Sequence, residues 1–313
     1  MASHFNLQGH RGARGLKPEN TLPSFERAFD LGVSSIETDV HLTRDGIPVL
    51  IHDAVISERL FRSLPDSTVP EPGTRPLVRS LTLAQLRAYA ADRNPDPEGF
   101  PDQDPGVTPL AAWFGEERRI HPMAPPALAD LFAFAEAYCA DPGRMAGKTN
   151  EQQAHVSMVR FDLELKREPF HPEFIGDGFD GTAPALLEQN VLNTIRECAM
   201  VTRTTVRSFD HRAVHQLGSL EPGLTTALLV ARTGLISPGD LVRQAGAQVF
   251  CPDYEFLDET QVRRAHAHDV RVIPWTVNNP NDWERLFAWE VDGITTDFPD
   301  RLADWLARRG IAF

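Results

Sequence analysis

Two carboxylates stand two residues apart in the segment SIETDVHLT, residues 35–43. Alternate side chains of a β-strand share a face, so Glu37 and Asp39 are expected to point the same way, about 7 Å apart. Carboxylates at that spacing repel each other unless a cation neutralises them, and Mg²⁺ and Ca²⁺ prefer carboxylate oxygens. The segment therefore indicates a metal site, although a solvent-facing strand would show the same alternation.

A later segment repeats this arrangement. In RFDLELKRE, residues 160–168, the side chains of Asp162, Glu164 and Lys166 share one face of the predicted strand. Glu164 could complete a site of three carboxylates, and Lys166 could hold a phosphate oxygen. A simple Glu–Lys surface pair is the alternative. The same acidic pattern at the same end of two strands favours the metal site.

Two histidines stand where strands are expected to end, His10 in GHRGARG and His52 in VLIHD. A single histidine in that position is often structural. Two of them beside a carboxylate cluster suit a general acid and a general base, because imidazole titrates near neutral pH. Imidazole could instead ligate a transition metal. Arg11, next to His10, offers a planar donor fork suited to phosphate.

Aromatic and acidic residues also follow later predicted strands. Phe209 in RSFD and Trp275 in PWTVN could cover the organic part of a substrate, or they could pack within the rim of the fold. Asp297 in TTDFPD could be the N-cap of the last helix, because Pro299 and Asp300 suit a first helical turn.

Short apolar strands alternate with helical stretches along most of the chain, which is typical of a parallel α/β fold. Eight principal strands are predicted at residues 6–9, 34–39, 158–165, 204–209, 225–231, 248–251, 270–276 and 293–296. Helices are predicted at residues 21–31, 128–139, 211–220, 258–267 and 281–289. Eight strand–helix units predict a (β/α)₈ TIM barrel, a fold of about 250 residues.

The chain has 313 residues, and its surplus falls mainly after the second barrel strand. We expect one domain, residues 1–313, with an insertion at residues 44–126, where prolines and short polar stretches interrupt the alternation. Within it, residues 46–53 indicate an additional strand and residues 81–90 a short helix. A second loop-rich stretch, residues 167–182, follows the third barrel strand. Both lie at the face where barrel enzymes build their active sites.

The composition limits the partners. Lys and Arg number 31 against 44 Asp and Glu, giving a net charge of −13, so nucleic acid and stable association with anionic membranes are disfavoured. A small anionic substrate is compatible, because a cation can reverse the sign of the charge inside one cleft.

No run of about 18 apolar residues appears, and the first residues lack signal-peptide features. We expect a cytoplasmic protein, or a periplasmic one if the N-terminus has been processed. Cys139, Cys198 and Cys251 are expected to be buried thiols. The sequence does not indicate the oligomeric state.

The ordered set of motifs resembles the glycerophosphodiester phosphodiesterase family. The matching segments are HRGARGLKPENTLPSFERA, IETDVHLTRDGIPVLIHD, DLELK, RSF, WTVN and GITTDFP, from residue 10 to about residue 299. The opening HRG…PENT, followed by ExD and HD, is the specific part. The resemblance implies a (β/α)₈ barrel with an insertion after the second strand. It also implies cleavage of glycerophosphodiesters to glycerol 3-phosphate and an alcohol, with Mg²⁺ or Ca²⁺ as cofactor.

The resemblance also implies a role for each matching residue. Glu37, Asp39 and Glu164 become the metal ligands, His10 and His52 the base and the acid, Arg11 and Lys166 the phosphate contacts, and Phe209 and Trp275 the border of the glycerol pocket. Glu19 and Asn20 of the PENT element are expected to shape the site, with Glu19 close to the metal. The nucleophile is either water or the 2-hydroxyl of the substrate. The long segment 54–126 and the extended stretch after Lys166 depart from a minimal member and leave the alcohol specificity open.

Two other functions fit parts of the sequence. A related barrel that cleaves lysophospholipids or sphingomyelin would need an apolar, membrane-facing rim, for which the insertion offers only Leu60, Phe61, Trp113 and Phe114. A non-catalytic barrel that binds a phosphorylated ligand would not need the two histidines.

Overall fold

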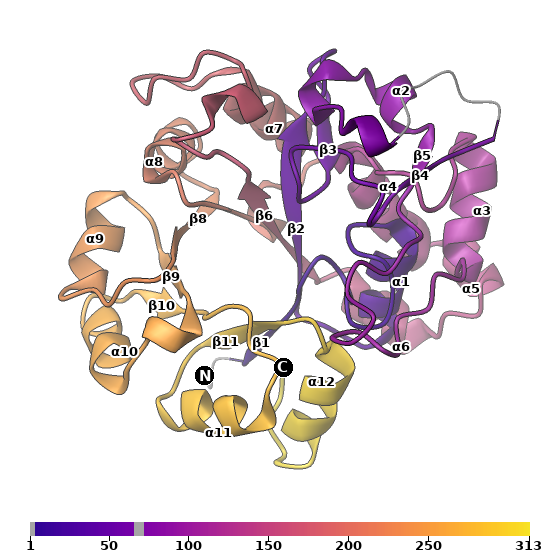
Figure 1. The fold of residues 1–313 in the computed structure, drawn as a ribbon. Helices are drawn as coiled ribbons and strands as arrows, with labels where there is room; N and C mark the ends of the chain where they lie inside the picture. Colours follow the sequence, from indigo (N-terminus) through magenta and orange to yellow (C-terminus); the bar gives the residue numbers. More distant parts are fainter. Residues whose placement is uncertain (1–3, 66–71) are drawn as a thin grey trace.

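The computed structural model describes residues 4–65 and 72–313. Within these ranges, eight parallel strands surround a central axis, and helices cover them from outside (Figure 1). The strands are β1 (Asn6–Gly9), β2 (Ser35–Leu42), β6 (Arg160–Leu165), β7 (Thr204–Ser208), β8 (Thr225–Val230), β9 (Val249–Pro252), β10 (Arg271–Val272) and β11 (Gly293–Thr296). Their spatial order is β10-β9-β8-β7-β6-β2-β1-β11. The predicted α/β barrel is confirmed.

The last two strands bring the barrel close to closure. The backbone N–H of Thr295 donates to the carbonyl of Pro274 at 3.0 Å, and that of Val277 donates to Thr295 at 2.9 Å. The predicted strand 270–276 is nevertheless too long, since β10 covers only Arg271–Val272. Pro274 has no N–H to donate and interrupts the regular ladder.

The outer layer follows from helical capping and from apolar spacing. It consists of α1 (Leu22–Asp30), α4 (Leu128–Cys139), α5 (Asp141–Met145), α6 (Asn150–Val156), α7 (Leu186–Glu197), α8 (His211–Leu220), α9 (Pro238–Gln244), α10 (Glu259–His266), α11 (Pro280–Ala288) and α12 (Pro299–Ala307). In α1, the Thr21 hydroxyl caps the first turn, while Leu22, Phe25 and Phe29 are fully buried. The i, i+3, i+4 spacing of these apolar residues places them on the face toward the barrel.

The interior of the barrel is polar on one side and apolar on the other. On the polar side, Gln8 of β1 donates to Asp162 of β6 at 2.8 Å, and Arg207 of β7 pairs with Glu37 of β2 at 3.0 Å. On the other side, residues of β8, β9 and the segment after β10 form a small apolar cluster: Ala227, Leu229, Val249, Cys251 and Ile273. The charged half of the interior is therefore lined by β1, β2, β6 and β7. Two of these strands, β2 and β6, carry the predicted carboxylates.

Residues 44–126, named the insertion below, connect β2 to α4. They contain β3 (Pro48–Leu50), β4 (Arg62–Ser63), α2 (Leu83–Leu86), β5 (Tyr89–Ala90) and α3 (Pro109–Arg118). β3 pairs antiparallel with the end of β2, which explains why β2 extends beyond the predicted segment 34–39. The predicted helix 81–90 is shorter than expected, because Tyr89–Ala90 pairs with β4.

Single 3₁₀ turns occur along the described chain at η1 (Pro72–Thr74), η2 (Val78–Ser80), η3 (Pro172–Phe174), η4 (Val201–Arg203) and η5 (Tyr254–Phe256).

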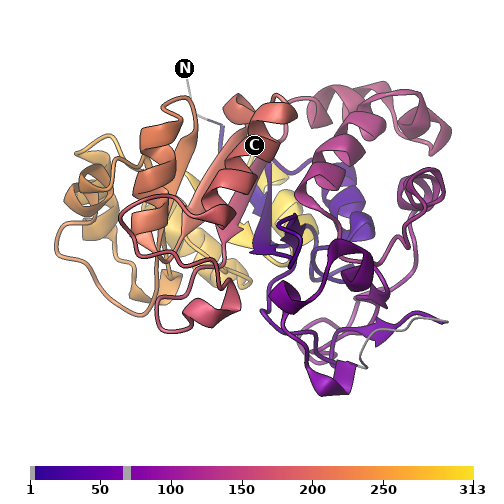
Figure 2. The same ribbon diagram turned by 90° about the horizontal axis from the view of Figure 1, so that it is seen from above.

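Helix α3 of the insertion packs on the main core, whereas other apolar residues between positions 49 and 91 form a small core of their own. Val49, Ile56, Phe61, Val78 and Tyr89 belong to this core. Figure 2 shows that the insertion and the loop between β6 and α7 project from the same end of the barrel, opposite to the N-terminus. That end carries the carboxyl ends of the parallel strands, where the site is predicted.

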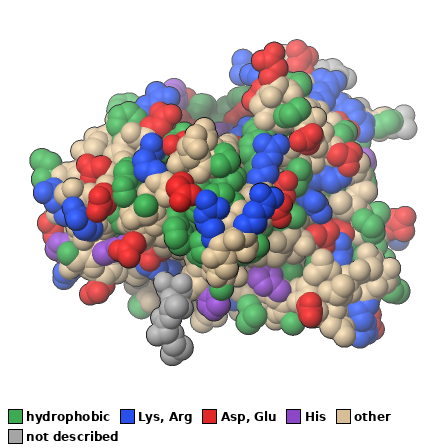
Figure 3. Space-filling model, turned by 90° about the horizontal axis from the view of Figure 1, so that it is seen from below, with side chains coloured by type: hydrophobic (Ala, Val, Ile, Leu, Met, Phe, Trp, Pro, Cys, Tyr) green, Lys and Arg blue, Asp and Glu red, His purple; other side chains and the backbone are tan. Residues whose placement is uncertain are grey.

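Two surface features bear on the predicted partners. Within the described residues, no helix is both long enough and apolar enough to cross a membrane. On the face shown in Figure 3, Lys and Arg side chains are interspersed with Asp and Glu.

The prediction for the cysteines is wrong for two of the three: only Cys251 is buried, whereas Cys139 and Cys198 are partly exposed because they stand at the ends of α4 and α7.

Candidate active site

Three carboxylates meet at the carboxyl ends of two adjacent strands. Asp39 of β2 lies opposite Glu164 of β6 in the parallel ladder, and Glu37 precedes Asp39 on the same face. One oxygen of each lies within 4.8 Å of the others, and all three residues are buried. The alternation of the two strands therefore brings the predicted ligand set together.

The carboxylates differ in their charge partners. Lys166 Nζ lies 2.7 Å from Glu164 Oε1 and 3.6 Å from Asp39 Oδ1. Burial opposes ionisation of Asp39, but His52, Arg11 and Lys166 hold the pKa of this carboxyl well below its usual range.

The negative charge of Glu37 is less well balanced by neighbouring groups than that of Asp39. Burial raises the pKa of Glu37, although the Arg207 guanidinium opposes that rise. Among the described residues, Glu37 Oε1 has no hydrogen-bond partner: Arg207 lies 3.0 Å away, without hydrogen-bond geometry. A buried carboxylate oxygen without a hydrogen bond, next to two further carboxylates, fits a hard divalent cation.

His10 is held from its outer side by a carboxylate. Its Nδ1 lies 2.6 Å from Asp297 Oδ1, and Asn278 donates to Asp297 Oδ2 at 2.7 Å. Burial would raise the pKa of Asp297, but His10 and Arg14 lower it to about 2. An ionised Asp297 accepts the proton of Nδ1, which leaves Nε2 facing Glu37 Oε2 at 3.7 Å.

The N-cap role predicted for Asp297 is wrong. The N-cap of α12 is Phe298, without a side-chain cap, and the carboxylate of Asp297 turns toward His10 instead. Sequence reasoning also gave no role to Arg207. Two features of the sequence could have identified these residues. Asp297 directly follows a barrel strand, and the alternation of side chains along β7 points Arg207 inward.

His52 reaches the site from the insertion, just after β3. Its Nδ1 lies 2.7 Å from Asp53, and 32% of its side chain is exposed, against 12% for His10. The backbone carbonyl of His52 lies 3.1 Å from Nε2 of His41. Burial, with a smaller contribution from Lys166, lowers the pKa of His41 to about 4. The neutral ring must therefore donate its Nε2 proton to that carbonyl, because Nδ1 is buried and makes no hydrogen bond within the described residues.

Glu19 and Asn20 of the PENT element contact the site through Arg11 and Asp39. The Arg11 guanidinium donates to Glu19 at 2.7 Å and approaches Asp39 at 3.3 Å, and Arg14 pairs with the other oxygen of Glu19 at 2.7 Å. Glu19 thus orients two arginines and stands outside the group of three carboxylates. Asn20 donates to Asp39 Oδ2 at 2.9 Å. Arg11 and Asn20 have φ of 50° and 53°, a conformation that non-glycine residues rarely adopt and that occurs often at functional sites.

The two predicted aromatic residues contact each other. The ring centroids of Phe209 and Trp275 lie 5.6 Å apart at 85°, and the indole N–H donates to the Cys251 carbonyl. Phe209 also borders a cavity of about 550 Å³ with His52, Glu164 and Lys166. Every predicted site residue therefore lies at this end of the barrel.

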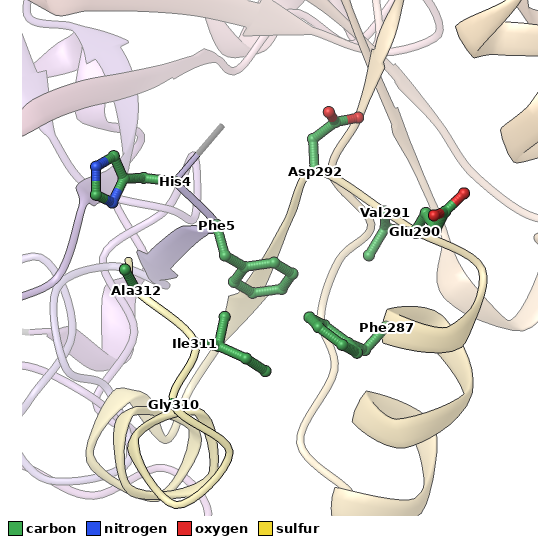
Figure 4. Close-up of a pocket in the computed structure, with 9 residues that line it drawn as sticks. All are labelled: His4, Phe5, Phe287, Glu290, Val291, Asp292, Gly310, Ile311 and Ala312. Carbon is green, nitrogen blue, oxygen red and sulfur yellow. The ribbon is translucent and has the colours of Figure 1, made fainter. Parts of the chain in front are cut away.

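A second cavity of about 570 Å³ lies at the opposite end of the barrel (Figure 4). Phe5 and Ile311 point into it, and Phe287 lies across from them. The carboxylate of Asp292, which lines this cavity, already accepts a hydrogen bond from the backbone N–H of Val272 and contacts the ring of His266. It contains none of the predicted site residues.

Comparisons with known proteins point to one family. Residues 10–177 and 179–301 match the model of the glycerophosphoryl diester phosphodiesterase family. The chain is 41% identical over 311 residues to a probable glycerophosphodiester phosphodiesterase 1 of Mycobacterium tuberculosis, covering 98% of this chain and 94% of the relative. It is 27% identical over 302 residues to a glycerophosphodiester phosphodiesterase of Caldanaerobacter subterraneus subsp. tengcongensis, covering 96% and 97%.

Solved structures show the same fold. A putative glycerophosphoryl diester phosphodiesterase from Silicibacter pomeroyi superposes with a TM-score of 0.78 at 27% identity, covering 100% of this chain and 96% of the other. A phosphodiesterase from Oleispira antarctica, in complex with the product sn-glycerol-3-phosphate, gives a TM-score of 0.65 at 19% identity, covering 97% of both chains. The chain therefore belongs to the glycerophosphoryl diester phosphodiesterase family.

Proposed function

We propose that this family member hydrolyses glycerophosphodiesters to glycerol 3-phosphate and an alcohol by two-histidine acid–base catalysis at a divalent cation. The observation that carries the proposal is the convergence of His10 and His52 on one buried cluster of three carboxylates. The histidines come from different segments: His10 directly follows β1, and His52 follows β3 of the insertion. The proposal treats residues 44–126 as an insertion within one domain.

The cluster supports a cation site. Glu37, Asp39 and Glu164 would hold Mg²⁺ or Ca²⁺, which when bound supplies Lewis-acid polarisation of the phosphoryl group. Lys166 and Arg11 would bind phosphate oxygens, because both side chains lie beside Asp39, next to the proposed cation. Phe209 and Trp275 would border the glycerol end of the substrate.

The two proton transfers follow from the hydrogen bonds of the rings. During hydrolysis the nucleophile oxygen forms a bond to phosphorus, and the bond from phosphorus to the alcohol oxygen breaks. His10, with its Nδ1 proton held by Asp297, accepts the proton of the nucleophile at Nε2. His52 delivers a proton to the departing alcohol oxygen. Each such transfer is worth roughly 10²–10⁴-fold in rate.

Water and the 2-hydroxyl of the substrate are both compatible as nucleophile. With the 2-hydroxyl, a cyclic phosphate forms first and water opens it in a second step. Isolation of the cyclic phosphate from a short reaction would support that route.

A coupled assay for glycerol 3-phosphate released from glycerophosphocholine tests the activity and its metal dependence. We expect release with Mg²⁺ or Ca²⁺, loss of release with chelator, and recovery when excess cation is added. Independently of activity, the cation should raise the melting temperature of the wild type but not that of the Glu37→Gln variant. Chelator-resistant turnover would refute the metal assignment. No release from any glycerophosphodiester would favour the non-catalytic binding function.

The structure gives little support to a lipid phosphodiesterase. Phe61 and Phe114, two of the four candidates for an apolar rim, are each only 2% exposed. Leu60 packs on the insertion core, and Trp113 packs on the main core. Two exposed rings border the cavity, Phe170 at 94% and Phe209 at 39%, and the proposed function already uses Phe209 at the glycerol end. We therefore expect faster hydrolysis of glycerophosphocholine than of lysophosphatidylcholine.

A further inference from the structure

We propose that the cleft between the insertion and the catalytic centre binds a leaving alcohol that carries a second anionic group, such as a phosphorylated polyol. The inference rests on the proposed function and assigns the substrate class of the same site. Its basis is a group of four arginines that line one cavity of about 440 Å³: Arg11, Arg14, Arg59 and Arg75. Such a group is unexpected in a chain with a net charge of −13.

Three carboxylates line the same cavity, and two of them already have side-chain partners. Glu19 pairs with both Arg11 and Arg14, and Asp53 pairs with the ring of His52. The third, Asp96, accepts a hydrogen bond from the backbone N–H of Gly99 at 3.1 Å.

The other two arginines are available for a ligand. Arg59 and Arg75 are exposed, and neither forms an ion pair within residues 4–65 and 72–313. Arg59 donates one hydrogen bond to the carbonyl of Pro95 at 3.0 Å, which fixes the direction of its side chain and leaves other donors unused. With four guanidinium groups against three carboxylates, the cavity has an excess of positive charge.

The position of His52 assigns this cavity to the leaving alcohol. His52 borders it and also borders the cavity that contains Phe209 and Lys166. Because the proposed acid must lie next to the departing oxygen, the two parts of the substrate should extend from His52 into the two cavities. With Phe209 at the glycerol end, as the proposed function has it, the arginine-lined cavity takes the alcohol.

The chemistry of the arginines selects the charge of the alcohol. A guanidinium group binds phosphate through paired N–H donors, and such charge-assisted hydrogen bonds are the stronger ones. A choline group carries a positive charge and would be repelled by the same side chains. An alcohol with a phosphate group should therefore be preferred over an uncharged one, and an uncharged one over choline.

A matched pair of substrates tests this preference. Glycerophosphoinositol 4-phosphate and glycerophosphoinositol differ only in the phosphate on the alcohol, and both release glycerol 3-phosphate. We expect kcat/KM to be higher for the phosphorylated substrate, with each unpaired arginine contributing roughly tenfold. Arg59→Ala and Arg75→Ala should each reduce this preference roughly tenfold. The preference should also fall with increasing salt, because the two side chains are exposed.

Arg118→Ala is the matched control. Arg118 is exposed on α3 of the same insertion and does not line the cavity, so its removal changes the net charge equally and should leave the preference intact. Equal kcat/KM for the two substrates, or the same preference in Arg59→Ala and Arg118→Ala, would overturn the inference while leaving the proposed function intact. No release of glycerol 3-phosphate from either substrate or from glycerophosphocholine would overturn both.

Discussion

The two histidines of the site are supported in different ways. His10 directly follows the barrel strand β1, is 12% exposed, and donates to Asp297, a carboxylate that is itself only 5% exposed. His52 lies on the insertion, is 32% exposed, and has a partner, Asp53, that is 61% exposed. Its firmer support comes through the backbone, from the buried ring of His41.

This difference separates two requirements of the reaction. A base that must meet the same nucleophile in every substrate gains from a rigid barrel strand with a buried partner. His52, the proposed acid, must meet the leaving alcohol, and it lies on the segment that also borders the proposed alcohol cavity. Under the proposed function, we expect changes in the insertion to alter the preferred substrate without disturbing His10 and its carboxylate partner.

Removal of either imidazole should have the largest effect and should expose the difference. His10→Ala and His52→Ala should each lower kcat by roughly 10²–10⁴-fold on glycerophosphocholine. With a glycerophosphoryl nitrophenol substrate, whose leaving group departs without a proton, only His52→Ala should recover most of the activity. Steady-state kinetics on the two substrates measures this recovery.

Added imidazole provides a control for the same pair of variants. It should restore more activity to His52→Ala than to His10→Ala, because the space left by His52 is open to solvent. Recovery of His10→Ala on the nitrophenol substrate would exchange the two roles. Near-normal activity of either variant on glycerophosphocholine would refute the two-histidine scheme.

The carboxylate partners should differ by a smaller amount. Asp297→Asn should lower kcat roughly 10²-fold, because an amide can donate to Nδ1 and favour the tautomer with a proton on Nε2. Asp53→Asn should cost less than tenfold, because solvent competes for the exposed hydrogen bond to His52. Equal losses in the two variants would show that exposure does not set the strength of support.

Much of this arrangement could be predicted from the sequence. Strand alternation placed Glu37, Asp39 and Glu164 on inner faces, and the motif order placed His10 and His52 beside them. These predictions depend on period and position along the chain. The structure brings these side chains together because the carboxyl ends of parallel strands converge at one end of the barrel.

The partners of these residues were much harder to predict. The contact between His10 and Asp297 joins positions 287 residues apart, and it depends on closure of the barrel, which no local pattern encodes. The use of His41 depends on the pairing of β3 with β2, which turns the chain back over its own strand. The lengths of β10 and α2 were overestimated because short elements end wherever their tertiary partners end.

Removal of the His41 donor should have a smaller effect than removal of Asp297. His41→Leu leaves the carbonyl of His52 without this hydrogen bond, and we expect kcat to fall roughly tenfold on glycerophosphocholine. His41→Gln keeps a donor and should recover part of the loss. A positioning role predicts little change on the nitrophenol substrate, since His52 is not needed there. Equal losses on both substrates would indicate a general structural role.

The smallest effect on turnover is expected in the loop between β6 and α7, which also borders the cavity with His52. Arg167 is anchored there by the buried carboxylates of Asp177, at 2.6 Å, and Glu188. Burial opposes ionisation of Asp177, but the hydrogen bonds from Arg167 and from the backbone N–H of Leu187 lower its pKa. A lowered native pKa gives stability that is complete above the unfolded pKa of about 3.9 and is lost as the pH falls through the native value.

Asp177→Asn should accordingly lower the free energy of unfolding by about 1–3 kcal/mol at pH 7, since one of its two contacts with Arg167 is lost. The difference from the wild type should shrink as the pH approaches 3, and kcat should change less than twofold. Denaturant unfolding at the two pH values measures the difference, with Asp180→Asn on the exposed part of the same loop as control. A loss of activity as large as that of His41→Leu would show that this loop, and not the insertion alone, sets the position of His52. A stability difference that stays constant down to pH 3 would remove the charge of Asp177 as the cause, because a carboxylate that contributes through ionisation must lose its advantage once it is protonated.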